Sequence, residues 1–267
     1  EEHYVKLNTE KYGGMILSTW LDRALSVAGR VVVREGRELV TKLVNVDKDL
    51  LVIPNVAIHM NREMNQGVAY NPQCDMLPLF ADCSEGKKKN AFMKRIAKAA
   101  GVKVEDILSH DLFLYPREKG RVLGENGEFL LSPRLDDLQC VFAESRAFCE
   151  SRPEEYVNVC AVFDNEEVGS GTKQGADSTF LEDTLYRIAE GLGLEKGDYL
   201  RMIAESFLIS ADNAHAVHPN HPEKADPTNR PYVNGGIVIK FHGSQKYATD
   251  AVSAAKLKDL CEEAHVP

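Results

Sequence analysis

Three groups of acidic residues in the second half of the chain could bind a divalent metal ion. Each group comes shortly after an apolar run that is typical of a strand. The groups are Asp136-Asp137, residues 164–167 and Asp212. Because the ligand sites of open α/β sheets lie at the carboxyl ends of the strands, we expect the three groups at one edge of a sheet. Carboxylates placed close together repel one another, and a divalent cation removes that repulsion.

Each acidic group also has a purely structural interpretation. Asp136 or Asp137 could cap the start of a helix, and Asp212 could close an Asx turn. The pair Glu166-Glu167 could consist of ordinary surface acids. These interpretations give no reason for three groups to converge, and convergence is what favours a metal site.

The adjacent pair Glu166-Glu167 is the most informative feature of the sequence. In a loop after a strand, neighbouring side chains point in different directions, so one carboxylate can hold a metal while the other faces the metal-bound water. Metal-assisted hydrolysis needs this division between a ligand and a proton acceptor. Gly169 and Gly171 permit tight turns directly afterwards. A phosphate-binding glycine loop is the alternative, but the G-x-x-x-x-G-K-[ST] pattern is missing.

Three histidines are further candidates for the site. His215 and His218 are three residues apart and follow Asp212 closely, a spacing that would permit metal ligation. Hydrogen bonding to substrate or within the structure is the favoured interpretation for both. His59 ends the apolar run 56–58, where a structural role is the simpler explanation.

Periodicity and turn residues predict a β-rich first half and an α/β second half. The predicted strands are residues 31–33, 50–53, 56–58, 156–163, 207–210 and 236–240, and the predicted helices are residues 90–100, 138–150, 180–192 and 251–264. Strands that alternate with helices indicate an α/β layer with a mainly parallel sheet. We therefore expect a β-rich module at 21–131 and an α/β module at 132–267, and residues 1–20 could belong to either.

Composition narrows the classes of function. The 267 residues are 43% hydrophobic and 27% charged, and 32 basic against 41 acidic residues give a net charge of −9. This charge argues against a nucleic-acid partner, and no apolar run approaches the ~20 residues of a membrane span. The six cysteines include no C-x-x-C pair, which favours a reducing, cytoplasmic location. The chain begins at Glu1 rather than at Met, so we expect an internal piece of a longer protein.

Several motifs in these regions occur together in one known family. They are residues 11–14 (KYGG), 18–23 (STWLDR), 53–59 (IPNVAIH), 132–136 (SPRLD), 163–170 (FDNEEVGS), 208–212 (LISAD) and 214–220 (AHAVHPN). On these segments the sequence resembles the aspartyl aminopeptidase family, which also contains vacuolar aminopeptidase I. The motifs run in family order from one end of the chain to the other.

The resemblance implies a fold, an assembly and a cofactor. It implies an α/β peptidase domain of zinc aminopeptidase type, here residues 1–20 and 132–267, with an inserted β-rich lid and oligomerisation domain at 21–131. It also implies two zinc ions or related divalent metal ions, peptide substrates, and a homo-oligomer that is typically a dodecamer. The family's two metal-binding histidines would fall outside residues 1–267, so the resemblance covers the central part of a family member.

The resemblance also implies roles for individual residues. By motif position they are Asp136 as the carboxylate that bridges two metals, Glu167 and Asp212 as ligands to one metal each, Glu166 as general base, Lys240 as the group that holds an acidic substrate side chain, and His59 as a lid histidine that reaches a neighbouring subunit's site. We add His215 and His218 as candidate substrate-binding residues. The expected reaction is release of N-terminal Asp or Glu from peptides. A preference for neutral residues and a non-catalytic assembly module are the alternatives.

Overall fold

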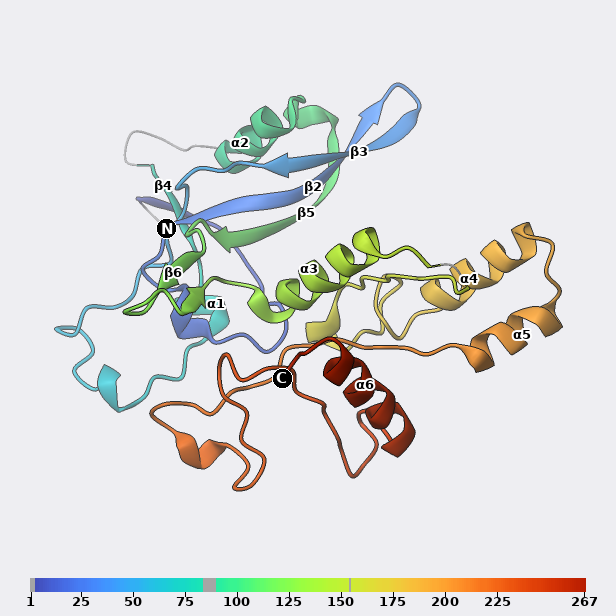
Figure 1. The fold of residues 1–267 in the computed structure, drawn as a ribbon. Helices are drawn as coiled ribbons and strands as arrows, with labels where there is room; N and C mark the ends of the chain where they lie inside the picture. Colours follow the sequence, from blue (N-terminus) through green and yellow to red (C-terminus); the bar gives the residue numbers. More distant parts are fainter. Residues whose placement is uncertain (1–2, 84–89, 154) are drawn as a thin grey trace. The chain divides into compact units, whose positions relative to one another are not determined.

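The computed structural model describes residues 3–83, 90–153 and 155–267 (Figure 1). The chain divides into two compact units. The first unit contains residues 1–133 and 161–206, and the second contains residues 134–160 and 207–267. We describe each unit by itself. The predicted division into 21–131 and the remainder is a different partition of the chain and stays a prediction.

A three-stranded antiparallel sheet forms the centre of the first unit. Its order is β3 (Glu38–Asn45), β2 (Leu25–Glu35) and β5 (Ile107–Pro116). Alternate residues of β2, namely Val27, Val31 and Val33, are buried on one face, as expected for a strand with one face on a core. The predicted strand at 31–33 is therefore confirmed, within a longer strand.

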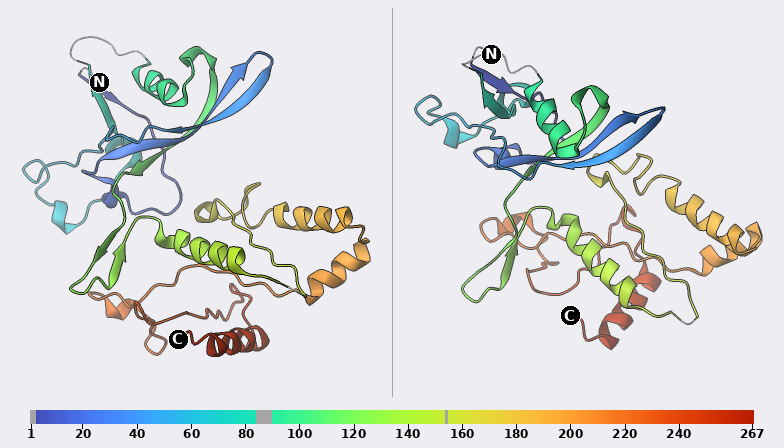
Figure 2. Two further views of the ribbon diagram at one scale, coloured as in Figure 1. Left: turned by 45° about the horizontal axis from the view of Figure 1, so that its top comes forward. Right: turned by 90° about the horizontal axis from the view of Figure 1, so that it is seen from above.

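Helix α2 (Ala91–Ala100) covers the buried face of this sheet (Figure 2). Ile96 is 0% exposed in the core between them, and Phe92 stacks edge to face on Phe80 at 5.6 Å between ring centroids. The helix ends at Gly101, which adopts the left-handed conformation at φ +69°, a conformation in which glycine has no steric cost. The predicted helix at 90–100 is confirmed.

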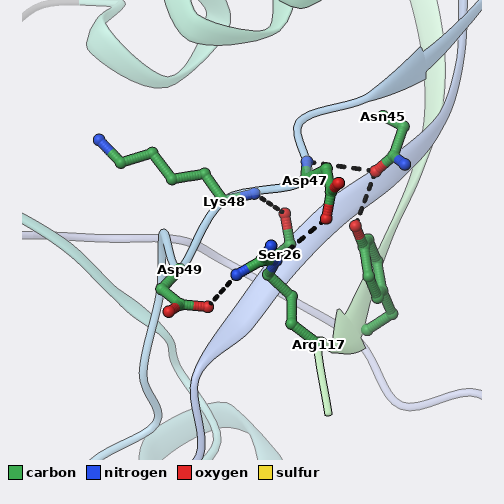
Figure 3. A network of polar contacts seen from close by, with 7 residues as sticks. Ser26, Asn45, Asp47, Lys48, Asp49 and Arg117 are labelled. Carbon is green, nitrogen blue, oxygen red and sulfur yellow. Dashed lines mark hydrogen bonds and ion pairs between the residues drawn. The ribbon is translucent and has the colours of Figure 1, made fainter. Parts of the chain in front are cut away.

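A polar network joins the strand ends on this sheet (Figure 3). The Arg117 guanidinium donates to the carboxylates of Asp47 at 3.1 Å and Asp49 at 2.6 Å. The Tyr115 hydroxyl, on β5, donates to the side-chain oxygen of Asn45 at 2.7 Å. These bonds hold the turn after β3 against the end of β5.

Shorter elements complete the first half of the chain. β1 (Tyr4–Lys6) pairs with β4 (Leu79–Asp82), and β6 (Arg121–Leu123) pairs with β7 (Phe129–Leu131), both antiparallel. α1 (Pro72–Asp75) is a single turn. The predicted strand at 50–53 consists only of isolated bridges at residues 51–53, and the predicted strand at 56–58 is wrong, because these residues form a loop and the start of a turn.

The helices predicted in the second half are confirmed. They are α3 (Leu135–Glu150), α4 (Phe180–Gly191) and α6 (Ala251–Glu263). In α6, Asp250 and Ser253 form the capping box that starts the helix. The sequence analysis missed α5 (Lys196–Glu205), which begins with a capping box of Glu195 and Asp198.

The strands predicted at 156–163, 207–210 and 236–240 are wrong, because none of these segments has a ladder of backbone hydrogen bonds. A segment forms a strand of a sheet only where a neighbouring strand accepts and donates those hydrogen bonds. An apolar composition does not by itself provide a neighbouring strand. Their apolar side chains are exposed, as Val157 (82%), Leu208 (78%) and Ile237 (55%) show. All paired strands of the described residues are antiparallel, so the mainly parallel sheet is not confirmed, whereas a mixed α/β fold is.

Membrane insertion finds no support in the described residues. None of their helices combines the length and the apolar character that crossing a membrane requires.

Candidate functional site

Three aspartates of the second unit form a group that could hold a metal ion. One carboxylate oxygen from each of Asp136, Asp137 and Asp212 lies within 4.8 Å of the other two. Asp136 and Asp212 were both predicted as ligands, and the structure brings them together although 76 positions separate them in the chain. Asp137 belongs to an acidic group predicted for this edge of the sheet, but no ligand role of its own was predicted for it.

The start of α3 positions two of these carboxylates. Asp136 (φ −83°, ψ 110°) and Asp137 (φ −114°, ψ 21°) have non-helical backbones, and the peptide bond between them is cis. The regular helix therefore begins only after Asp137, at the residue where the sequence predicts it. Both side chains therefore project from residues that precede the regular part of the helix.

Lys240 contacts the third aspartate of the group. Its ammonium donates to Oδ2 of Asp212 at 2.6 Å and to the backbone oxygen of Asn213 at 2.8 Å. The Lys240 side chain is 20% exposed, and its ammonium lies 5.7 Å from the centre of the Tyr247 ring. The predicted substrate-binding lysine thus lies beside the carboxylates and forms an ion pair with one of them.

Burial and the nearby aspartates together shift the pKa values of two neighbouring side chains. Burial, a hydrogen bond to Asp137 and the nearby carboxylates raise the pKa of the Cys140 thiol to about 12. Burial and the charge of Asp137 likewise raise the pKa of Glu144. The donors that lie within reach of one another in this group are carboxylate oxygens of Asp136, Asp137 and Asp212.

The carboxylate group fits a divalent cation. Oδ1 of Asp137 is buried and has no hydrogen-bond partner among the described residues, and an orphaned buried oxygen is costly unless something binds it. A divalent cation would satisfy that oxygen and lower the negative potential at the same time. Zinc accepts aspartate oxygens, usually together with nitrogen donors.

The predicted pair Glu166-Glu167 lies in an ordered loop of the first unit. Residues Glu166–Val168 form one 3-10 turn between Asn165, which is left-handed at φ 62°, and Gly169. The backbone N–H of Asp164 donates to the Gln174 oxygen at 3.0 Å, and the Asn165 side chain donates to the Thr172 hydroxyl at 2.9 Å. We call residues 164–170 the acidic loop.

Two residues near the start of the chain contact the acidic loop. The Tyr12 hydroxyl donates to the side-chain oxygen of Asn165 at 3.1 Å. Burial and the charges of Asp164, Glu167 and Glu166 raise the pKa of Tyr12. Gly13, at φ +62°, lies so close to the loop that an added Cβ would be 2.9 Å from both the Cβ and the backbone oxygen of Glu167.

The histidines lie outside the carboxylate group, which is the one cluster of its kind among the described residues. His59 and His215 are exposed. His218 is exposed too, and its Nδ1 accepts the backbone N–H of Asn220 at 3.1 Å. Its ring lies 5.1 Å from that of His221. The contacts of His218 agree with hydrogen bonding, the role that the sequence favours.

The family comparison decides to which class this chain belongs. The sequence pattern of the family described as "Aminopeptidase I zinc metalloprotease (M18)" matches residues 1–267. The chain belongs to the M18 family. The predicted resemblance is thereby confirmed, since aminopeptidase I and the aspartyl aminopeptidases are of this type.

Individual relatives of the M18 chain agree in sequence and in structure. "Probable M18 family aminopeptidase 2" of Clostridium acetobutylicum is 51% identical in an alignment over 270 residues. The alignment covers 100% of this chain and 62% of that protein. The solved structure "Cryo-EM structure of the Ape4 and Nbr1 complex" is similar at a TM-score of 0.90 and 35% identity, over 99% of this chain and 55% of that one. "Structure of S. cerevesiae mApe1 dodecamer" is similar at a TM-score of 0.78 and 28% identity, over 97% of this chain and 60% of that one. The M18 chain thus spans about three fifths of the length of these relatives.

Proposed function

We propose that the protein containing this M18 chain is a metal-dependent aminopeptidase that releases N-terminal residues from peptides. The observation that carries the proposal is the carboxylate group of Asp136, Asp137 and Asp212, with its orphaned oxygen, in a chain of a zinc metalloprotease family.

The proposed cofactor is a pair of divalent metal ions, zinc in the first instance. Asp136 is the proposed bridging ligand, and Glu167 and Asp212 are the proposed ligands to one metal each. When bound, such ions polarise the substrate carbonyl and lower the pKa of water. The carboxylate group supports Asp136 and Asp212 as ligands, and Glu167 is assigned by its position in the family motif at residues 163–170.

Glu166 is the proposed general base. Its role is to take the proton of the attacking water and to pass it to the leaving nitrogen of the peptide. The 3-10 turn makes this possible, because adjacent side chains in it leave the backbone in different directions. In this proposal Glu167 serves as ligand and Glu166 takes the proton.

The proposed substrates carry an acidic N-terminal residue, which Lys240 would bind through its ammonium. The support is the position of that ammonium beside the carboxylate group. The ion pair with Asp212 is also the observation that favours the alternative of a neutral preference, because it already uses the charge of Lys240. We propose His59, His215 and His218 as further substrate-side residues.

We further propose that the complete protein is a cytoplasmic homo-oligomer in which residues 21–131 form a lid. The similar mApe1 structure of S. cerevesiae is described as a dodecamer. We propose the mainly parallel sheet only for the complete protein, in which the apolar side chains exposed on segments 156–163, 207–210 and 236–240 are expected to be covered. Hydrogen exchange of these segments in the full-length protein tests this assignment, and slow exchange is the expected result.

Activity of the full-length protein on Asp-linked and Leu-linked chromogenic substrates tests the function. We expect metal-dependent release of Asp, and a larger loss on the Asp substrate than on the Leu substrate in Lys240→Met. Equal losses on both substrates would contradict the acidic preference and favour the neutral alternative. A metal-free protein that forms an oligomer and releases neither residue would instead support the assembly module.

A further inference from the structure

The acidic loop is contacted from a distant part of the sequence at the two residues that flank the proposed general base. Tyr12 bonds to Asn165, the residue before Glu166, and Gly13 packs against Glu167, the residue after it. These contacts link positions about 150 residues apart within the first unit. Two neighbouring residues therefore fix both sides of Glu166.

Asn165 connects Tyr12 to the backbone of the acidic loop through its hydrogen bonds. Its side-chain oxygen accepts from Tyr12, and its amide nitrogen donates to Thr172, so both ends of the amide have partners and its orientation is defined. Its backbone oxygen accepts the N–H groups of Val168 and Ser170 at 3.3 and 3.1 Å. The 3-10 turn that carries Glu166 closes on this residue.

We infer that Tyr12 is a positioning residue for Glu166, and that it acts through its hydrogen bond to Asn165. The inference rests on the proposed function, in which Glu166 is the general base. A base must be held within about 0.5 Å of its productive place, and a misplacement of about 1 Å can cost on the order of 10²-fold in rate.

The experiment compares Tyr12→Phe with Tyr115→Phe in the full-length protein. Both substitutions remove one hydroxyl that donates to an asparagine side-chain oxygen, at 3.1 Å and 2.7 Å, but Tyr115 joins strands of the sheet. We expect Tyr12→Phe to lower kcat about fivefold, the size that one lost hydrogen bond allows, with KM and metal content unchanged. We expect Tyr115→Phe to keep kcat, and thermal unfolding to show comparable midpoints for both.

A double-mutant cycle with Asn165→Gly tests the route through Asn165. Glycine keeps the left-handed backbone accessible while it removes the side chain. Adding Tyr12→Phe to Asn165→Gly should then lower kcat no further. Additive losses of kcat from Tyr12→Phe and Asn165→Gly would overturn the inference, and so would an unchanged kcat in Tyr12→Phe. Either result, in an enzyme that is otherwise active, would leave the proposed function intact. A wild-type protein that releases no N-terminal residue would overturn the proposed function and this inference with it.

Discussion

Replacing Lys240 by Met should make the carboxylate group bind divalent metal ions more tightly. The Lys240 ammonium lies 2.6 Å from Oδ2 of Asp212, and there it competes with a metal ion for that oxygen and repels the ion. The side chains are 20% and 57% exposed, so solvent screens much of the interaction. Two unit charges 4 Å apart in water interact by about 1 kcal/mol, and exposed pairs contribute up to about 1 kcal/mol. Such a change corresponds to roughly fivefold in a dissociation constant.

Calorimetric titration of metal-free full-length protein with zinc measures the effect of Lys240→Met. Lys256→Met is the matched control, because the Lys256 ammonium lies 5.2 Å from the centre of the Phe207 ring and its described partner is this ring rather than a carboxylate. We expect tighter binding in Lys240→Met and no change in Lys256→Met. Weaker zinc binding in Lys240→Met, or an equal gain in both variants, would refute the reasoning that the lysine competes with the metal.

Four further outcomes follow from the fold and the site. Glu166→Gln keeps the shape of the side chain and should lower kcat by about 10²-fold or more at an unchanged metal content, and near-normal turnover would exclude this base. Ile96→Ala should lower the free energy of unfolding by about 2–5 kcal/mol in urea titrations, because the side chain is fully buried. A loss below about 1 kcal/mol would contradict the rigid packing of the core around Ile96. Cys140, with a pKa of about 12, should react with iodoacetamide at pH 8 far more slowly in the folded, metal-free protein than in urea, and equal rates would contradict the burial of this thiol beside the aspartates. Since unfolding releases this thiol to ionise near pH 9, stability should fall as pH rises from there toward 12.

Local signals in the sequence predicted the helices well and the strands poorly. Gly101 and the Asp250–Ser253 capping box mark helix ends that depend only on nearby residues. The segment 156–163 has the composition of a buried strand, but it would need partners for its hydrogen bonds, and composition does not reveal partners. Helix α5 was missed because Gly197 lies in its first turn, where glycine weakens the helical pattern.

The candidate site was partly predictable for a similar reason. The strand-then-acid placement led to Asp136 and Asp212, which do meet, although the strand expected before Asp212 is absent from the structure. The apolar run before Asp136, in contrast, does form a strand, β7. The roles of Tyr12 and Gly13 were not predictable from spacing, because they depend on a contact across about 150 residues.

The metal content of the full-length protein tests the central claim most directly. Purified wild-type protein and Asp136→Asn should be compared by elemental analysis after equal exposure to zinc, with Asp226→Asn as control, because Asp226 closes a turn through Thr228 and Asn229 outside the carboxylate group. We predict two zinc ions per subunit in the wild type and in the control, and loss of most zinc in Asp136→Asn. An unchanged zinc content in Asp136→Asn would contradict the claim that these aspartates form the metal centre.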